Sequence, residues 1–317
     1  MRNIAIIGLG GVGGYFGFKI NYANKRNTIT FIARGNTFQK IQADGLTLLS
    51  SEHSDAVTIP DHIYDDIKAI HKPDLIFICV KEYDLEAVCT QLQEVVCPST
   101  ILIPLMNGAD IYERIRKFLT NQIILPACVY VASHIKEKGV VVHKGKSGRI
   151  FIGNDPEKKD VSINWILELL VESGIDFVHS ENILNDIWTK FIFIASFGLV
   201  TARFNSSIGE VCINPVQRQK AIAIMEEIST VAKRKNIELA AGIVEKTLEK
   251  AATFPPDTPT SLQLDIHSGR EQNELPLFAG AIVRMGLETG VPTPCTAAIE
   301  EEIARKVESI RQTKSTF

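Results

Sequence analysis

At 317 residues with 45% hydrophobic side chains, the chain is long enough for two domains that each bury a core. The net charge is −3 at pH 7 and no lysine or arginine run stands out, which argues against binding to nucleic acid or to an anionic membrane. The six cysteines form no C-x-x-C pair, so we expect reduced thiols in the cytoplasm and no metal site. A small molecule is therefore the expected partner.

The first half of the chain alternates between strand and helix patterns. NIAIIGLG, TITFIAR, DLIFICVK and STILIPLMNG are short apolar runs typical of strands covered on both faces, and helical patterns lie between them. Shorter strands are expected at LTLLS and AVTIP. This α/β alternation predicts a parallel, doubly wound sheet, which further strands between 122 and 180 complete as one domain.

Beyond residue 180 the patterns are helical. Helices are expected at 182–204, 214–236, 240–253, 273–289 and 294–312, with an irregular, proline-rich segment at 254–274. The apolar run FIFIASFGLV is about half the ~20 residues that a membrane span requires, so we interpret it as part of a buried helix. The sequence thus predicts a nucleotide-binding domain over 1–180 and an all-helical domain over 181–317, which would bind substrate or form a dimer.

Gly8, Gly10 and Gly13 form a G-x-G-x-x-G motif between the first predicted strand and the first predicted helix. In a Rossmann-type βαβ unit the first glycine permits a tight turn, the second lets the backbone approach a pyrophosphate, and the third allows close packing of helix on strand. The helix N-terminus also favours negative charge. A plain turn is the alternative, but the βαβ context favours a dinucleotide site.

The end of the second predicted strand indicates which dinucleotide. An acid at this position would bind the ribose hydroxyls of NAD, but FIARGN offers Arg34, about twenty residues after the glycines, and no acid before Asp44. This favours NADPH/NADP+. The alternative is that Arg34 is an ordinary surface residue.

Lys81 and Asn107 end the predicted strands DLIFICVK and STILIPLMNG. Ligands of open α/β sheets bind at the carboxyl ends of the strands, where Asn107 could offer a donor and an acceptor to nicotinamide or substrate. Asn107-Gly108 is equally a common turn dipeptide.

Lys190 stands at the start of an apolar stretch in IWTKFIFIASFGLV. A partly buried lysine can give up a proton near neutral pH, as reduction of a ketone requires, although a lysine whose charge reaches solvent is the alternative. Ser261, Asp265 and Glu274 lie in or just after the polar segment. Ser261 could hydrogen-bond a carboxylate, and Glu274 could hold a hydroxyl or set the protonation of Lys190; the alternative is that these are surface loop residues.

The motifs, taken in chain order, resemble those of the ketopantoate reductases (2-dehydropantoate 2-reductases) over nearly the whole chain. The resemblance rests on IAIIGLGGVGGYFG, FIARGNTFQKIQADGL, VKEYDLEAV, PLMNGAD, IWTKF, TSLQLDIHSGR and GVPTP. It implies an N-terminal Rossmann domain, an all-α C-terminal domain and an active site between them. The implied activity is NADPH-dependent reduction of 2-dehydropantoate to (R)-pantoate, a step in pantothenate and coenzyme A biosynthesis.

The resemblance also implies roles for the N-terminal residues. The three motif glycines are implied to bind the pyrophosphate and Arg34 the 2′-phosphate, while Lys81 and Asn107 are implied to lie beside the nicotinamide and the substrate.

For the helical half, the resemblance implies that Lys190 is the general acid, Ser261 a ligand of the substrate carboxylate and Glu274 the acid that anchors substrate beside the lysine. The family commonly has asparagines four and eight positions after the lysine, where this chain has Ile194 and Gly198. These apolar positions would bind dehydropantoate differently or suit a bulkier 2-oxo acid.

Matching Glu274 requires one residue more than the usual spacing, so Asn273 is an alternative for that position. Two alternative functions stay open at this point, a reductase of another branched 2-oxo acid and a non-catalytic NADP-binding sensor. The protein is expected to be a monomer or a homodimer.

Overall fold

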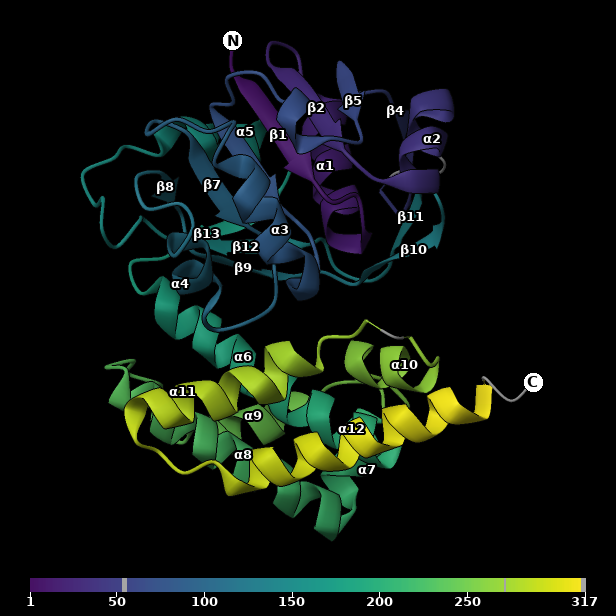
Figure 1. Cartoon of the computed structure of the whole chain (residues 1–317), viewed down its shortest axis with the longest axis vertical. Helices are drawn as coiled ribbons and strands as arrows, with labels where there is room; N and C mark the ends of the chain where they lie inside the picture. Colours follow the sequence, from purple (N-terminus) through teal and green to yellow (C-terminus); the bar gives the residue numbers. More distant parts are fainter. Residues whose placement is uncertain (53–55, 271, 315–317) are drawn as a thin grey trace. The chain divides into compact units, whose positions relative to one another are not determined.

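The computed structural model describes residues 1–52, 56–270 and 272–314. The chain divides into two compact units, Met1–Ile183 and Leu184–Phe317. In Figure 1 the N-terminal unit runs from purple to teal and the C-terminal unit from green to yellow. Each unit is described by itself below.

The centre of the N-terminal unit is a six-stranded sheet in the order β5-β2-β1-β6-β7-β8, with every neighbouring pair parallel. Its interior strands are almost entirely buried, as the unbroken apolar runs predicted. The predicted parallel, doubly wound sheet is therefore confirmed. The strands are β1 (Asn3–Ile7), β2 (Thr28–Ile32), β5 (His62–Tyr64), β6 (Leu75–Ile78), β7 (Ile101–Pro104) and β8 (Ile123–Ile124).

Helices connect these strands and cover the sheet (Figure 1). The helices of this unit are α1 (Gly11–Ala23), α2 (Gly35–Asp44), α3 (Glu82–Leu92), α4 (Ile111–Arg116) and α5 (Asn164–Glu172), with a 3-10 turn at Ile67–Ala69.

The remaining strands form two smaller sheets rather than extending the main one. LTLLS and AVTIP are strands as expected, but they pair with each other in a separate sheet. In that sheet LTLLS also pairs with Val140–His143 (β11), and the short strand β5 takes the edge of the main sheet instead. Helix α1 packs against β1 and also against this second sheet. The small sheets have the orders β10 (Ser133–Glu137), β11 (Val140–His143), β3 (Leu46–Leu49), β4 (Ala56–Thr58), and β13 (Asp176–His179), β12 (Arg149–Ile152), β9 (Ala127–Tyr130).

The described part of the C-terminal unit is helical, as predicted. Its elements are α6 (Ile183–Phe204), α7 (Ile208–Ile213), α8 (Pro215–Arg234), α9 (Ile243–Ala252), α10 (Ser261–His267), a π-helix η2 (Pro276–Gly280), α11 (Ala281–Thr289) and α12 (Pro294–Lys314).

The expectation that 254–274 is irregular throughout is wrong, because this segment contains α10. The side chain of Thr260 accepts a hydrogen bond from the Gln263 amide, and the Gln263 side chain reciprocates at the Thr260 amide. This capping box starts the helix directly after the proline-rich stretch.

Helix α6 has 22 residues and is long and apolar enough to cross a bilayer. The expectation that the apolar run at 191–200 is too short for a membrane span was wrong, because this run is only part of a longer apolar helix. However, 72% of its most apolar window is buried inside the fold, as in the core helix of a soluble protein, and Trp188, Phe191 and Phe197 are fully buried. The predicted buried helix is confirmed by packing rather than by length.

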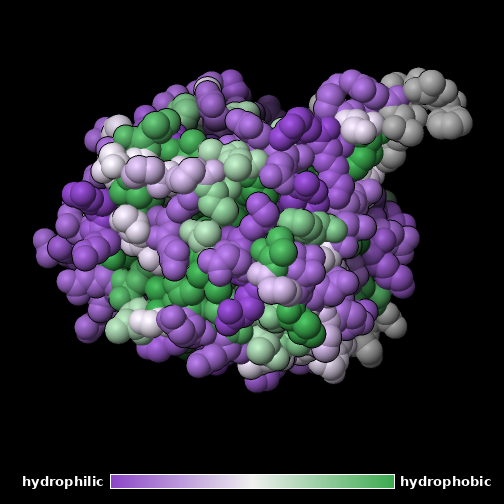
Figure 2. Space-filling model, turned by 90° about the horizontal axis from the view of Figure 1, so that it is seen from below, coloured by the Kyte–Doolittle hydropathy of each residue, from purple (hydrophilic) through white to green (hydrophobic). Residues whose placement is uncertain are grey.

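Seen from below, the surface is largely hydrophilic, with apolar side chains in several separate patches (Figure 2). Exposed large hydrophobic residues of the C-terminal unit include Ile213, Val216 and Leu287. Scattered apolar side chains are normal on folded proteins, so a homodimer stays a prediction.

Candidate functional site

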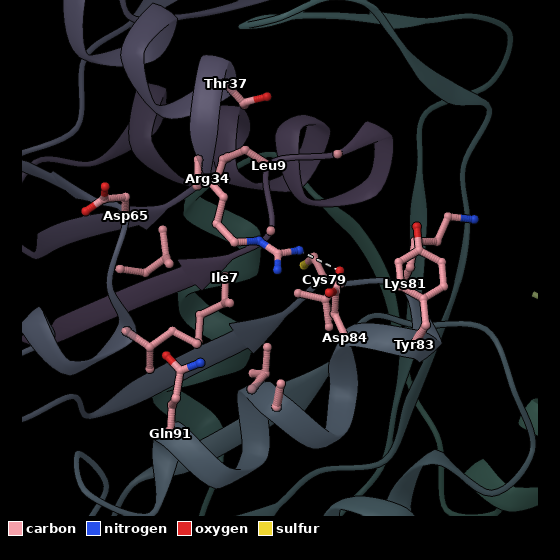
Figure 3. A pocket seen from close by; sticks show the side chains of 18 of the residues that line it. Ile7, Leu9, Arg34, Thr37, Asp65, Cys79, Lys81, Tyr83, Asp84 and Gln91 are labelled. Carbon is pink, nitrogen blue, oxygen red and sulfur yellow. Dashed lines mark hydrogen bonds and ion pairs between the residues drawn. The ribbon is translucent and has the colours of Figure 1, made fainter. Parts of the chain in front are cut away.

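A cavity of about 420 Å³ opens at the carboxyl ends of β1, β2 and β6. Because β1 lies between β2 and β6, this is the point at which the strand order reverses, where open α/β sheets bind ligands. Figure 3 shows side chains from these strands and from α3 around the cavity. Its lining includes Gly8, Gly10, Arg34, Lys81, Asp84 and Lys138.

The three motif glycines differ in their surroundings. Gly8 has a φ of +92°, and a Cβ there would lie 2.8 Å from the Cys79 carbonyl oxygen. A Cβ on Gly10, the N-cap of α1, would meet nothing within 4 Å. A Cβ on Gly13 would lie 2.0 Å from the Gly8 carbonyl oxygen. The turn, the open approach and the close packing therefore occur at the positions where a pyrophosphate site needs them.

Two further glycines of the same run were not singled out from the sequence. A Cβ on Gly11 would lie 2.6 Å from the carbonyl oxygen of Ser133 in β10, and one on Gly14 would lie 2.4 Å from Cγ2 of Val141 in β11. The run G-G-V-G-G thus lets α1 pack against two sheets, and its excess of glycine was the available signal.

Arg34 is the N-cap residue of α2 and lines the cavity. Its Nη2 lies 2.6 Å from Oδ2 of Asp84, in the first turn of α3 (Figure 3). Asp65 also lines the cavity. Neither carboxylate was predicted from the sequence, since an acid was considered only at the end of the second strand. Asp84 follows the strand that ends at Lys81, and that position was the usable signal.

Lys81 is the N-cap residue of α3 and lines the cavity, whereas Asn107, which follows β7, is not among its lining residues. Both follow strands that run parallel in the same sheet, so they lie along the same edge. Cys79 also lines the cavity, and burial raises the pKa of its thiol well above the ordinary range, so the thiol stays protonated at neutral pH.

In the C-terminal unit, Lys190, Ile194 and Gly198 lie on one face of α6 because they are four residues apart. Lys190 is only 7% exposed. Thr201 lies on this face too, and its hydroxyl is 2.7 Å from the hydroxyl of Thr260, the N-cap residue of α10.

Helix α10, which carries Ser261, and η2, which follows Glu274, pack on α6. A Cβ on Gly198 would lie 3.8 Å from Cβ of Leu262 in α10 and 4.0 Å from Cε2 of Phe278 in η2. Ser261 is between two residues that contact α6. The amide of Phe278 donates to the Glu274 carbonyl at 3.2 Å, so Glu274 begins the turn that contacts α6.

Glu274 and Asn273 differ in their environment. Glu274 is buried, at 4% exposure. Asn273 is partly exposed, and its side-chain oxygen accepts from the Leu275 amide at 3.0 Å. The Asn273 side chain is therefore used in the local turn.

Asp265 is also buried, and its carboxylate pairs with Arg270 at 2.7 Å. Within the described ranges, no group of three or more histidine, cysteine, aspartate or glutamate side chains is arranged to hold a metal ion.

A doubly wound sheet with a glycine-rich turn at its switch point, followed by an all-helical unit, is typical of a class of Rossmann-type dinucleotide-binding proteins. The chain belongs to the ketopantoate reductase family. Residues 4–157 match the family model "Ketopantoate reductase PanE/ApbA", and residues 182–307 match "Ketopantoate reductase PanE/ApbA C terminal".

Individual relatives are distant. The chain is 26% identical over 292 residues to a 2-dehydropantoate 2-reductase of Archaeoglobus fulgidus, covering 92% of this chain and 93% of the relative. It is 24% identical over 265 residues to the "Uncharacterized oxidoreductase YkpB" of Bacillus subtilis, covering 84% and 86%.

Solved structures share the fold. The PanE/ApbA family ketopantoate reductase of Ralstonia eutropha superposes with a TM-score of 0.87 at 23% identity, covering 97% of this chain and 99% of that one. D-mandelate dehydrogenase, in a ternary structure with NADH and anilino(oxo)acetate, superposes with a TM-score of 0.85 at 24% identity, covering 98% and 99%.

Proposed function

We propose that the protein is an NADPH-dependent 2-dehydropantoate 2-reductase that forms (R)-pantoate for pantothenate biosynthesis in the cytoplasm, with Lys190 as general acid. Membership of the ketopantoate reductase family supports a reductase of this type. The proposal also takes residues 1–180 as the NADP-binding domain and 181–317 as the substrate-binding domain.

The residues of the N-terminal unit fit a dinucleotide. The open space at Gly10, at the N-terminus of the 13-residue helix α1, suits a pyrophosphate. Arg34 offers a guanidinium for a 2′-phosphate, and Lys81 and Asn107 lie along the edge where nicotinamide and substrate would bind. When bound, the cofactor supplies the hydride.

The residues of the C-terminal unit fit the proton-transfer half of the reaction. Lys190 would donate a proton to the oxygen of the reduced carbonyl, Glu274 would hold the hydroxyl beside it, and Ser261 would donate to the substrate carboxylate. The burial of Glu274 and the local hydrogen bond of Asn273 favour Glu274 for this role.

The observation that carries the proposal is the burial of Lys190. Burying a lysine is costly unless its charge is paired and hydrogen-bonded, so lysines are rarely fully buried. Here the lysine is 7% exposed, and α10 and η2 contact the same face of α6 further along the helix, at Thr201 and Gly198.

Lys190→Ala tests the assignment. We expect kcat for NADPH oxidation with 2-dehydropantoate to fall by ~10²–10⁴-fold, which is the usual contribution of a general acid. Lys246→Ala, at an exposed lysine of α9, is the matched control and should leave kcat unchanged. Circular dichroism and the thermal midpoint would establish that both variants are folded.

Two outcomes would contradict the proposal in different ways. A folded Lys190→Ala variant with more than about a tenth of the wild-type kcat would exclude the general-acid role. If the wild-type protein binds NADPH but none of the 2-oxo acids tested supports its oxidation, the result would instead favour a non-catalytic NADP-binding sensor.

A second candidate is a reductase of another, bulkier 2-oxo acid. Ile194 and Gly198 have no polar side-chain group where the resemblance implies asparagines. Leu262 and Phe278 border Gly198. That D-mandelate dehydrogenase shares the fold fits this possibility. Comparing kcat/KM for 2-dehydropantoate, 2-oxoisovalerate and phenylglyoxylate would distinguish the candidates, and a clear preference for 2-dehydropantoate would exclude the second.

A further inference from the structure

The cavity at the carboxyl ends of the strands carries charges of both signs. Its lining includes the cations Arg34, Lys81 and Lys138 and the carboxylates Asp65 and Asp84. A carboxylate repels a phosphate at close range. The two carboxylates therefore require an explanation.

Asp84 is the carboxylate that contacts Arg34, the residue predicted to bind the 2′-phosphate. Its Oδ2 lies 2.6 Å from Nη2 of Arg34, and Figure 3 shows the guanidinium directed at Asp84. The Asp84 side chain is 21% exposed and that of Arg34 71% exposed. Asp84 lies in the first turn of α3, where the helix dipole favours a negative charge. Asp84 is thus the more enclosed partner, and Arg34 reaches it from solvent.

This ion pair contributes little to the fold. Ion pairs with a largely exposed partner typically stabilise a protein by about 0–1 kcal/mol. The pair joins the start of α2 to the start of α3, and both helices have other contacts, α2 with β5 and α3 with α4 and the 3-10 turn. An effect on ligand binding is therefore separable from an effect on stability.

We propose that Asp84 is a specificity-determining residue that competes with the cofactor 2′-phosphate for Arg34. A 2′-phosphate bound at Arg34 must share the guanidinium with a carboxylate, and the two anions repel each other. A ribose 2′-hydroxyl is neutral and leaves the ion pair intact. Asp84 thus lowers the preference for NADPH over NADH below the level that Arg34 alone would produce. This inference rests on the proposed binding of a dinucleotide in this cavity.

The test is the ratio of the dissociation constants of NADH and NADPH, measured by titration calorimetry on the full-length protein. Asp84→Asn keeps the shape of the side chain and removes its charge. We expect it to tighten NADPH binding about fivefold and to change NADH binding less than about twofold, since a unit charge at this range is worth about 1 kcal/mol in a solvated site. Glu86→Gln, an exposed position of α3 outside the cavity lining, is the matched control for net charge and should leave the ratio unchanged.

A second measurement separates competition from a general charge effect. In an Arg34→Ala background there is no guanidinium to share and only the direct repulsion between Asp84 and the phosphate remains, so Asp84→Asn should tighten NADPH binding less than it does in the wild type.

Each outcome bears on the inference. A ratio that is unchanged or lowered in Asp84→Asn would overturn it, as would an equal gain with and without Arg34. If the wild-type protein bound neither dinucleotide, the proposed function would fail and this inference with it. Binding of both without a change in ratio would refute the inference alone.

Discussion

The two units build their candidate sites from different parts of the chain. In the N-terminal unit the glycine run, the end of β2 and the start of α3 form a cavity whose lining includes the motif glycines Gly8 and Gly10. In the C-terminal unit the candidate residues are side chains on α6, α10 and the segment before η2, which are far apart in the sequence. A site built around glycines depends on steric limits at a few positions. A site built from side chains that are distant in the sequence depends on which residues the helices place side by side. The same kind of substitution should therefore affect the two units differently.

Replacing a glycine by alanine is the strongest test of this difference. In Gly13→Ala the new Cβ would lie 2.0 Å from the Gly8 carbonyl oxygen, so α1 must move away from β1. We expect a loss of more than about 3 kcal/mol in the free energy of unfolding and loss of dinucleotide binding. In Gly198→Ala the new Cβ has only ordinary contacts at 3.8 Å or more, and alanine in a helix should stabilise it by about 0.5–1 kcal/mol.

Urea unfolding of both variants, with NADPH titration of the folded proteins, would measure these effects. Equal destabilisation by the two substitutions would remove the proposed distinction between the units. A Gly13→Ala protein that still bound NADPH normally would show that the close packing of α1 on β1 is not required for the site.

A buried carboxylate of the N-terminal unit provides the next largest effect. Asp155 is 1% exposed and accepts hydrogen bonds from the Ile124 amide at 2.8 Å, the Tyr112 hydroxyl at 2.7 Å and Arg116 at 2.7 Å. Breaking a buried pair leaves a charge uncompensated, so Asp155→Asn should cost about 3 kcal/mol of stability. Asp176→Asn, which breaks the exposed Arg149–Asp176 pair, should cost under about 1 kcal/mol.

The effect of Asp155 should depend on pH in a defined direction. Burial alone would raise its pKa, but the hydrogen bonds from Ile124, Tyr112, Glu157 and Arg116 outweigh this and lower the pKa below 3.8. A carboxylate with a lowered pKa stabilises the folded state above its unfolded pKa and loses this contribution as the pH falls through the folded pKa. Urea unfolding at neutral pH and below pH 4 should therefore show the difference between wild type and Asp155→Asn shrinking with acid, and a difference independent of pH would contradict the assignment.

The same contrast explains how much the sequence could predict. The parallel sheet, the glycine turn and the helical second half follow from local patterns, because strand runs, glycines and helix periods are visible in short windows. The pairing of β3 with β11 and the place of β5 depend on contacts between distant segments. Asp84 was missed for a similar reason, since its proximity to Arg34 arises only when β2 and β6 flank β1. In the helical unit, no local pattern indicates that Thr260 and Leu262 contact α6.

Substrate preference is a smaller effect that concerns the side-chain site. Ile194→Asn and Gly198→Asn would add hydrogen-bonding groups on the Lys190 face of α6. We expect kcat/KM for 2-dehydropantoate to rise about tenfold relative to an apolar 2-oxo acid such as phenylglyoxylate, because one hydrogen bond to a substrate is worth about 0.5–1.5 kcal/mol. Leu264→Asn, at an exposed position of α10, is the control. An unchanged preference in both variants would indicate that this face does not contact substrate.

The smallest expected effect is a difference in the reactivity of cysteine thiols between the two units, which can be measured without altering stability or activity. Cys97, in the N-terminal unit between α3 and β7, is exposed, and hydrogen bonds from the Ser99 and Thr100 side chains lower the pKa of its thiol to about 7. Burial raises the pKa of Cys212 and Cys295 in the C-terminal unit. The thiolate is the reactive form. The rate of alkylation of Cys97 by iodoacetamide should therefore be half-maximal near pH 7 and level off above it. Cys212 and Cys295 should react slowly, at rates that continue to rise toward alkaline pH. Peptide mapping by mass spectrometry across a pH series would measure the three rates, and Ser99→Ala should shift the Cys97 profile to higher pH. A Cys97 profile that rose only above pH 8, or one that Ser99→Ala left in place, would show that these hydroxyls do not stabilise its thiolate.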